Sequence, residues 1–174
     1  MTPSPQKSNT CAVVVTYHPD KGLGDRIRRI LPQVAQVIVV DNSSKADGLE
    51  RIRELPGDIP IHLMLNKENV GIAAALNQGL RCAVEQGYRW ALLLDQDSVV
   101  AEKMLDSLAE AYNAFPKRDK AAVIGSNYQD AHSHRYLLQA GGDAGRLWEE
   151  RKTVITSGSL VSLEAHRVIG PFRN

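Results

Sequence analysis

Six short apolar blocks, separated by longer amphipathic stretches, set the pattern of this chain. The first, Cys11 to Thr16, is a continuous run that contains three valines in succession. Runs of this length and composition are typical of strands that are covered on both faces. The expected strands are residues 11–16, 37–40, 61–65, 90–94, 121–125 and 154–156.

Most of the stretches between these blocks carry apolar residues at helical spacing. The clearest has Ile72, Leu76 and Leu80 on one stripe. Asn69 is expected to cap the start of this helix, and Gly87 stands where a left-handed residue ends one. Strands that alternate with helices predict an α/β fold, a mostly parallel sheet with flanking helices. The other helices are expected near residues 23–31, 49–55, 104–112 and 163–169.

The composition is that of an ordinary globular chain. Of its 174 residues, 43% are hydrophobic and 24% are charged, and the formal net charge is +1. This near-neutral charge gives no indication of a nucleic-acid partner, and we expect none. No apolar run approaches the roughly 18–20 residues that span a bilayer. We expect one domain at residues 11–174, preceded by a disordered lead-in at residues 1–10.

Polar side chains follow each of the first four expected strands. Ligands of open α/β sheets bind outside the carboxyl ends of the strands, so these positions predict a shared ligand site. A dinucleotide site is excluded, because no glycine-rich fingerprint follows the first strand. The chain also lacks the GxxxxGK[ST] motif of a P-loop. The polar positions are Thr16-Tyr17, Asp41-Asn42, Asn66 and Asp95-Gln96-Asp97.

Asp95 and Asp97 end the fourth expected strand, and their spacing has a specific chemical use. In an extended chain, residues two apart point to the same side, so the two carboxylates are expected to repel each other. A divalent cation removes this conflict, and Mg²⁺ is commonly held by one or two carboxylates together with substrate phosphates. The pair therefore indicates a Mg²⁺ or Mn²⁺ site. A solvated turn, in which Asp97 or Ser98 caps the next helix, is the alternative.

The same stretch also fits a phosphatase pattern. Residues 95–99, DQDSV, match the DxDx[TV] motif of haloacid-dehalogenase-type phosphatases, in which the first Asp is the nucleophile. That motif sits on the first strand of its fold, whereas this one follows the fourth expected strand. Those enzymes also need a later pair of acids, and the adjacent pair available here is Glu149-Glu150. A phosphatase is therefore kept as an alternative.

Five motifs extend the pattern over almost the whole chain. They are VVVTYHPD, VIVVDNSS, LNKENVGIAAALNQGL, ALLLDQDS and ITSGSLVS. In this order and at these spacings they resemble family 2 glycosyltransferases, which have the GT-A fold. DQDS, with TYHPD before it and GPFR after it, is most similar to the bacterial rhamnosyltransferase branch. The resemblance implies metal-dependent, inverting transfer of a sugar, from dTDP-L-rhamnose in that branch, to a glycan or lipid-linked acceptor.

The resemblance also implies which residues would hold the nucleotide sugar. Thr16 and Tyr17 would line the base, and Asp41 would accept a hydrogen bond from its N3–H. Asn69 and Gly71 would open a helix whose N-terminus faces the donor phosphate or sugar. Each position has a structural alternative: a half-buried aromatic at Tyr17, a turn-stabilising role for Asp41 and a plain helix cap at Asn69.

The remaining implied roles concern the metal and the acceptor. Asp95 would contact the ribose or the donor sugar and would share the metal with Asp97, the principal ligand. Ser157 and Gly158 match the small-residue turn that the family places beside the donor sugar and the acceptor. That turn has a purely structural alternative.

The family's catalytic base is an Asp or Glu that follows a Gly-x-Phe turn. Here the turn is Gly170-Pro171-Phe172, and the chain ends at Asn174. We therefore expect a C-terminally truncated GT-A domain with no catalytic residue of its own and the base beyond Asn174. A non-catalytic nucleotide-binding domain is the alternative. The resemblance implies a cytoplasmic enzyme, with peripheral association of the full-length protein at the inner face of the membrane.

Overall fold

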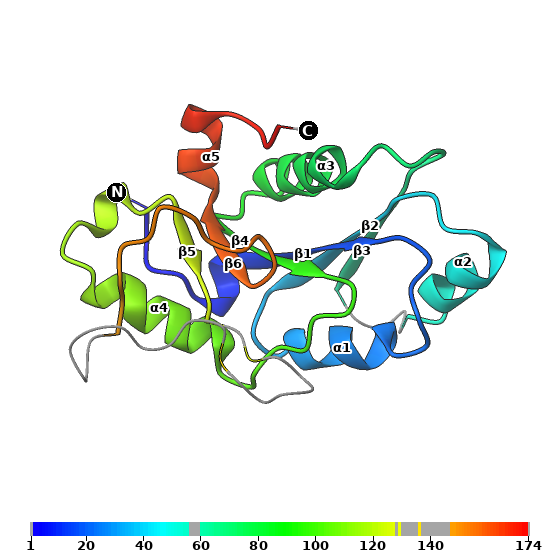
Figure 1. The fold of residues 1–174 in the computed structure, drawn as a ribbon, viewed down its shortest axis with the longest axis horizontal. Helices are drawn as coiled ribbons and strands as arrows, with labels where there is room; N and C mark the ends of the chain where they lie inside the picture. The colour runs from blue at the N-terminus through cyan, green and yellow to red at the C-terminus, as the bar shows by residue number, and fades with distance from the viewer. Residues whose placement is uncertain (1, 56–59, 128, 130–135, 137–146, 174) are drawn as a thin grey trace.

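The described part of the chain forms a six-stranded sheet with helices on both faces (Figure 1). The computed structural model describes residues 2–55, 60–127, 129, 136 and 147–173. The strands are β1 (Thr10–Thr16), β2 (Gln36–Asp41), β3 (Ile61–Leu65), β4 (Trp90–Asp95), β5 (Val123–Gly125) and β6 (Ser159–Ser162). The α-helices are α1 (Leu23–Ile30), α2 (Ala46–Arg53), α3 (Ile72–Glu85), α4 (Met104–Ala114) and α5 (Leu163–Ile169). Two 3-10 turns are η1 (Lys7–Asn9) and η2 (Arg118–Lys120).

The sheet has the strand order β3-β2-β1-β4-β6-β5. β1 lies between β2 and β4 and is parallel to both, and β3 is parallel to β2. β6 is antiparallel to its neighbours β4 and β5. The predicted mostly parallel sheet is confirmed, because each of the first three strands is followed by a helix that returns the chain to the starting edge.

The core has two layers because side chains alternate between the faces of a strand. Ala12 and Val14 of β1 face the layer that contains α1 and α4, whereas Val13 and Val15 face the layer that contains α3. Figure 1 shows α1 and α4 below the sheet and α3 and α5 above it. Burial raises the pKa of the Cys11 thiol to about 12, so this cysteine stays protonated and serves packing.

The helix α3 begins later than the sequence predicts. Gly71, with φ of +83°, precedes the first helical residue, Ile72, and the Asn69 side chain does not cap the helix. Instead, Asn69 Oδ1 accepts a hydrogen bond from Gly71 N at 2.9 Å. The predicted left-handed glycine after the helix is confirmed, since Gly87 has a φ of +84°.

The predicted strand at residues 154–156 is wrong. Val154 and Ile155 are exposed, and the strand lies later, at Ser159–Ser162, where all four residues are buried. Val154 packs over Gly125 of β5, so its apolar character serves a contact and not a strand. The serines at both ends of β6 hid the strand, because they break the apolar run that marks the other strands.

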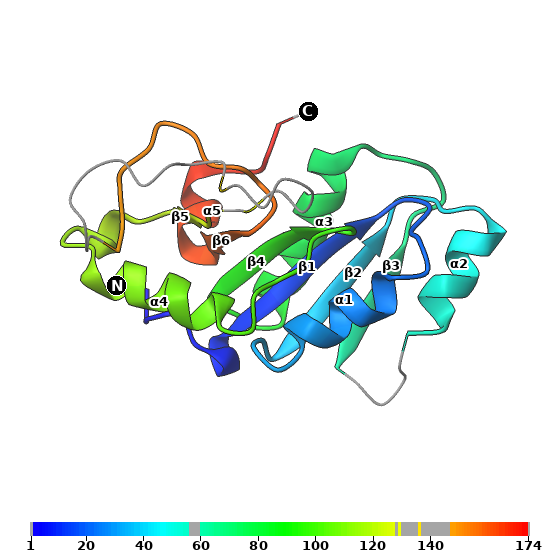
Figure 2. The ribbon, with the colours of Figure 1, turned by 60° about the horizontal axis from the view of Figure 1, so that its bottom comes forward.

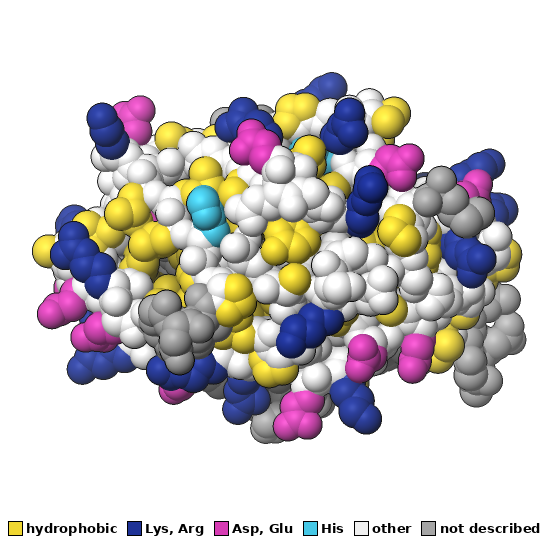
Figure 3. Space-filling model, turned by 180° about the vertical axis from the view of Figure 1, so that it is seen from behind, with side chains coloured by type: hydrophobic (Ala, Val, Ile, Leu, Met, Phe, Trp, Pro, Cys, Tyr) yellow, Lys and Arg dark blue, Asp and Glu magenta, His cyan; other side chains and the backbone are white. Residues whose placement is uncertain are grey.

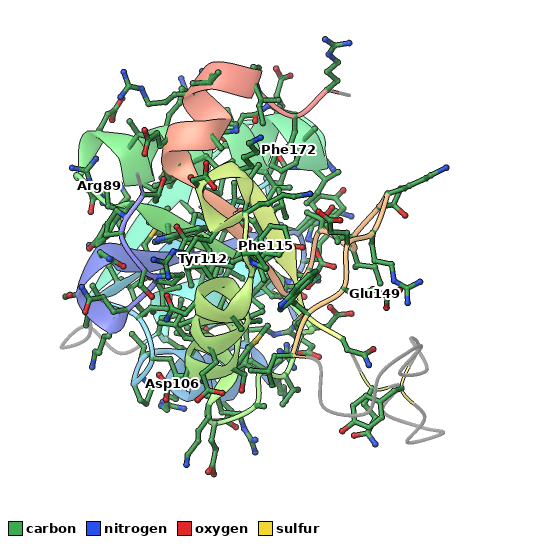
Figure 4. All side chains as sticks on the ribbon, turned by 90° about the vertical axis from the view of Figure 1, so that its left-hand side faces the viewer. Arg89, Asp106, Tyr112, Phe115, Glu149 and Phe172 are labelled. Atoms are coloured by element: carbon green, nitrogen blue, oxygen red, sulfur yellow. The ribbon has the colours of Figure 1, made fainter. Side chains whose placement is uncertain are left out.

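The N-terminal segment is held against the body of the molecule through Thr2 and Pro3, where a disordered lead-in was expected. The Trp90 indole N–H donates to the Pro3 carbonyl at 2.8 Å, and the Tyr112 hydroxyl donates to the Thr2 carbonyl at 2.9 Å. Tyr112 points from α4 into the interior, toward this segment, whereas Asp106 points away from it (Figure 4). A buried indole N–H needs an acceptor. The sequence could not indicate this contact, because a backbone carbonyl is available at any residue.

The surface carries charges of both signs. From behind, Lys and Arg side chains lie interspersed with Asp and Glu side chains (Figure 3). Within the described ranges, no helix has the length and apolar character needed to cross a membrane.

Candidate functional site

The ends of β1, β2 and β4 meet at one edge of the sheet (Figure 2). Thr16 pairs with Asp41 across β1 and β2, and Val15 pairs with Asp95 across β1 and β4. β2 and β3 lie on one side of β1 in the sheet, whereas β4 lies on the other side, so the strand order reverses at β1. Open α/β sheets bind ligands at such a switch point. The sequence therefore predicted correctly that these polar side chains gather.

Asp41, the last residue of β2, is fully buried at this edge of the sheet. Its Oδ1 accepts hydrogen bonds from the Thr16 hydroxyl, at 2.9 Å, and from the Ser44 hydroxyl, while its Oδ2 accepts one from Ser44 N at 2.8 Å. These bonds hold the turn that follows β2, which is the structural alternative stated for this residue. A contact of Thr16 or Asp41 with a base remains a prediction.

Asn42 joins the end of β2 to the loop before α3, and sequence reasoning gave it no role of its own. Its Oδ1 accepts hydrogen bonds from Val70 N at 2.9 Å and from Asn66 Nδ2 at 3.3 Å, and its Nδ2 donates to Asn69 Oδ1 at 2.7 Å. Because Asn69 also binds Gly71 N, this network fixes where α3 begins. It brings the predicted residues Asn69 and Gly71 to the site edge.

Asp95 and Asp97 lie on a turn at the end of β4. Ser98 N donates to the Asp95 carbonyl at 3.1 Å, so the chain leaves the extended conformation at Asp95. Burial, and then the negative charge of Asp97, raise the pKa of the Asp95 carboxyl. This is the electrostatic conflict that the sequence predicted for the pair.

The donor set of this turn fits a hard divalent cation that also binds a substrate. Two carboxylates are present, and among the described residues no group of three His, Cys, Asp or Glu side chains forms a fuller site. Mg²⁺ and Mn²⁺ accept this arrangement when phosphate oxygens supply further ligands. Asp95 and Asp97 are therefore the residues that would hold the ion.

Ser157 and Gly158 lie directly against the Asp95 turn. Asp95 N donates to Ser157 Oγ at 2.9 Å, and the hydroxyls of Ser98 and Ser157 are 2.7 Å apart. Gly158 N donates to the Leu93 carbonyl at 2.7 Å, and its φ is +80°. A Cβ at Gly158 would lie 2.4 Å from a hydroxyl oxygen of the neighbouring Ser126, so the turn needs glycine. The structure thus brings the predicted metal turn and the predicted small-residue turn together.

Tyr17 extends from the end of β1 and is 47% exposed. Its ring lies 4.1 Å, between centroids, from the ring of His18. Its backbone is bound by the side chain of Gln96, and the carbonyl of Gln96 accepts a hydrogen bond from Arg26 Nε at 2.6 Å. The sequence singled out Tyr17 but assigned no role to Gln96 or Arg26.

The Gly170-Pro171-Phe172 turn is held by α3. Asn77 Nδ2 donates to the Phe172 carbonyl, and Phe172 N donates to Asn77 Oδ1, both at 2.9 Å. Figure 4 shows Phe172 beside α3 and α5. Asn77 stands off the apolar stripe of its helix, and its amide has this specific use. Asn174, beyond which the base is expected, lies outside the described residues.

Comparison with known proteins agrees with the motifs. A family model described as "Glycosyl transferase family 2" matches residues 11–162. The chain belongs to this family. Membership argues against the phosphatase alternative, because it places the DQDS turn within a glycosyltransferase fold.

One curated relative of this family 2 chain is the dTDP-rhamnosyl transferase RfbF of Shigella flexneri. The two are 27% identical over 175 residues, which is 94% of this chain and 57% of the relative. The chain therefore spans a little over half of that relative's length.

Solved structures show the same GT-A fold, which confirms the predicted fold class. TarS of S. aureus, residues 1–349, has a TM-score of 0.64 at 14% identity, over 92% of this chain and 49% of that one. The mannosyltransferase PcManGT of Pyrobaculum calidifontis, in complex with GDP-Man and Mn²⁺, has a TM-score of 0.53 at 24% identity, over 70% of this chain and 36% of that one.

Proposed function

We propose that this chain is the nucleotide-sugar-binding domain of a metal-dependent, inverting glycosyltransferase. The observation that carries the proposal is the convergence of Asp95, Asp97 and Ser157 beside Tyr17 at one edge of the sheet. Family membership supports glycosyl transfer, and the similarity to the dTDP-rhamnosyl transferase of Shigella supports dTDP-L-rhamnose as donor. The Mn²⁺ in the mannosyltransferase complex supports a divalent cation.

In this proposal, the end of β1 and the turn after β2 receive the nucleoside. Tyr17 offers an exposed ring for the base, and Thr16 and Asp41 form the floor beneath it. Because Asp41 is fully buried, the turn at residues 42–45 has to shift before its carboxylate can accept the base N3–H. The N-terminus of α3, with Asn69 and Gly71, then faces the donor phosphate or sugar.

Asp95 and Asp97 would hold the divalent cation against the diphosphate. When bound, such a cation neutralises the charge that develops on the leaving diphosphate. Ser157 and Gly158, packed on the same turn, would border the donor sugar and the acceptor. The chain would thus bind and orient the donor, and it would place the leaving group at the edge of the sheet.

Removal of the acceptor proton is proposed for an acid beyond Asn174, on an inverting pathway in which the acceptor hydroxyl attacks opposite the diphosphate. Asn77 would set the direction of that segment through its two hydrogen bonds to Phe172. The acceptor is proposed to be a glycan or a lipid linked to one, and the enzyme to be cytoplasmic, with the full-length protein at the inner face of the membrane. Extending the gene past Asn174 should restore sugar transfer; a non-catalytic binding domain would show none.

Calorimetry with dTDP and Mn²⁺ tests the donor site. Wild-type protein should bind dTDP more tightly with Mn²⁺ than without it, and Asp97→Ala should weaken the Mn²⁺-dependent binding at least about tenfold, the lower range for loss of a supporting group at a metal site. Asp106→Ala, which removes an exposed aspartate in the first turn of α4, is the matched control. Equal, metal-independent binding by wild type and Asp97→Ala would count against the proposal.

A further inference from the structure

Gln96 lies between Asp95 and Asp97 in the turn after β4, which we call the metal turn. Its side chain, however, binds the backbone of Tyr17, just past the end of β1. Its Oε1 accepts a hydrogen bond from Tyr17 N at 2.8 Å, and its Nε2 donates to the Tyr17 carbonyl at 3.2 Å. One amide side chain therefore satisfies both polar atoms of one backbone residue, as a neighbouring strand would.

This contact lies just past the last regular pairing of β1 with β4, which is Val15 with Asp95. Beyond that pair, Tyr17 is on one loop and Asp97 is on another, and both side chains face solvent. The Gln96 amide joins these two loops directly, through its two hydrogen bonds to Tyr17. A movement of either loop is thereby passed to the other.

The backbone of the metal turn is also held from behind. Arg26 of α1, whose side chain is 16% exposed, donates from Nε to the Gln96 carbonyl at 2.6 Å. The same guanidinium forms an ion pair with Asp20, and Asp20 accepts a further hydrogen bond from Gly22 N at 2.8 Å. With its carbonyl fixed in this way, Gln96 has its side chain aimed at Tyr17.

We propose that Gln96 is a positioning residue that couples divalent-cation binding at Asp95 and Asp97 to nucleoside binding at Tyr17. The inference rests on the proposed function, because it presumes a cation on the turn and a nucleoside at the end of β1. Binding of the cation orders the turn, the ordered turn holds Gln96, and Gln96 holds the Tyr17 backbone in place before the nucleoside arrives. A ligand that rigidifies one loop lowers the ordering cost for a ligand on the other.

Thymidine titrations distinguish coupling through Gln96 from direct contact between the cation and the phosphates of a nucleotide. Thymidine has no phosphate, so Mg²⁺ can change its affinity only through the protein. Thymidine binding is measured from NMR shift changes during the titration. For the wild-type chain, we expect Mg²⁺ to raise the affinity for thymidine by about fivefold or more, which is the lower end of typical coupling between two sites. Gln96→Met keeps the length of the side chain and removes both hydrogen bonds, so Mg²⁺ should leave its thymidine affinity unchanged.

Gln33→Met is the matched control. Gln33 makes the same kind of amide clamp elsewhere: Oε1 accepts from Leu105 N at 3.0 Å and Nε2 donates to the Ala101 carbonyl at 2.9 Å. This variant should keep the Mg²⁺ effect on thymidine. Loss of the effect in both variants would indicate a general loosening of the fold and would overturn a specific role for Gln96.

Hydrogen exchange in the wild-type chain gives a readout that needs no variant. Mg²⁺ alone should slow exchange of the Tyr17 amide, whose proton is held by Gln96. Unchanged exchange, or a full Mg²⁺ effect in Gln96→Met, would overturn the inference while leaving the donor site intact. Failure of the wild-type chain to bind dTDP with Mg²⁺ or Mn²⁺ would instead overturn the proposed function, and this inference with it.

Discussion

At the level of the single residue, the ionised side chain of Asp95 lowers the stability of the folded protein. Burial and the charge of Asp97 raise its pKa in the folded protein above the value of about 3.9 expected in an unfolded chain. A raised carboxyl pKa means that the ionised form destabilises the folded state. The cost is absent below the unfolded pKa and grows as the pH rises through the folded pKa.

Asp95→Asn should therefore raise the free energy of unfolding at pH 7 in metal-free buffer. We expect about 1 kcal/mol or less, because the carboxylate is only partly buried and solvent screens its charge. Urea unfolding at a series of pH values measures the gain, which should shrink as the pH falls toward about 4. An equal gain at every pH, or a gain of the same size in Asp106→Asn, would contradict this assignment. In the proposed function the variant also loses a metal ligand, a typical exchange of function for stability.

The amide side chains of the site were the residues least open to sequence reasoning. Asn42, Asn77 and Gln96 each bind backbone atoms of a segment far away in the chain. At the end of a strand, an Asn or Gln also suits an ordinary solvated turn. The carboxylates Asp95 and Asp97 could be predicted because two like charges so close together, at the end of an apolar strand, repel each other unless a cation lies between them.

At the level of the element, α3 is seated on the sheet through Gly79. A Cβ at this position would lie 2.4 Å from Val13 Cγ1 and 3.3 Å from Val40 Cγ2. Both valines are β-branched and restricted at χ1, so they cannot easily move aside. The close approach of helix and sheet thus depends on the absence of a side chain.

Gly79→Ala should destabilise the fold although alanine is the better helix former. Overpacking costs typically about 1–3 kcal/mol and exceeds the gain in helix propensity of about 1 kcal/mol. Gly24→Ala in α1 is the opposite case, because its nearest neighbour is the flexible Arg28 side chain at 3.6 Å. Chemical unfolding should show a loss for Gly79→Ala and a gain of roughly 0.5–1 kcal/mol for Gly24→Ala. Changes of the same sign in both variants would refute the packing argument.

Elements buried on both faces were predicted best. β1 and β4 are continuous apolar runs because α-helices cover each face of the sheet. β6 escaped prediction because Ser159 and Ser162 flank its two apolar residues, and both serines are buried beside neighbouring strands. Periodicity records which side chains are apolar, whereas the pairing that buries a serine is set by tertiary structure.

For the whole molecule, the N-terminal segment joins parts that are distant in the chain. Thr2 and Pro3 accept hydrogen bonds from Tyr112 of α4 and Trp90 of β4. The Thr2 hydroxyl also donates to Glu164 of α5 at 2.8 Å. Because Trp90 is the first residue of β4, these contacts lie at the edge of the sheet opposite the candidate site.

Deletion of residues 2–6 should lower stability without changing nucleotide binding. It leaves the buried indole N–H and the Tyr112 hydroxyl without their acceptors, at a cost of about 1–3 kcal/mol for each group that stays unpaired. Thermal unfolding and dTDP calorimetry measure the two effects. Thr2→Ala is the control, since it keeps the carbonyl and removes only the hydroxyl, with its contacts to Glu164 and Ser162. An unchanged midpoint for the deletion would show that the segment contributes nothing to the fold.

β6 is expected to join the sheet after β1 to β4 during folding. β1 to β4 come from one continuous stretch of chain, whereas β6 has to close a long loop before Ser159 can pair with Leu93. Long-range pairing of this kind is slow, because the entropy of closure is lost before the contact forms. Pulse-labelling exchange should therefore find the Val14 amide protected before that of Leu160. Since Ser157 and Gly158 lead into β6, a nascent molecule would acquire the proposed nucleoside side of its site first and the proposed acceptor side last.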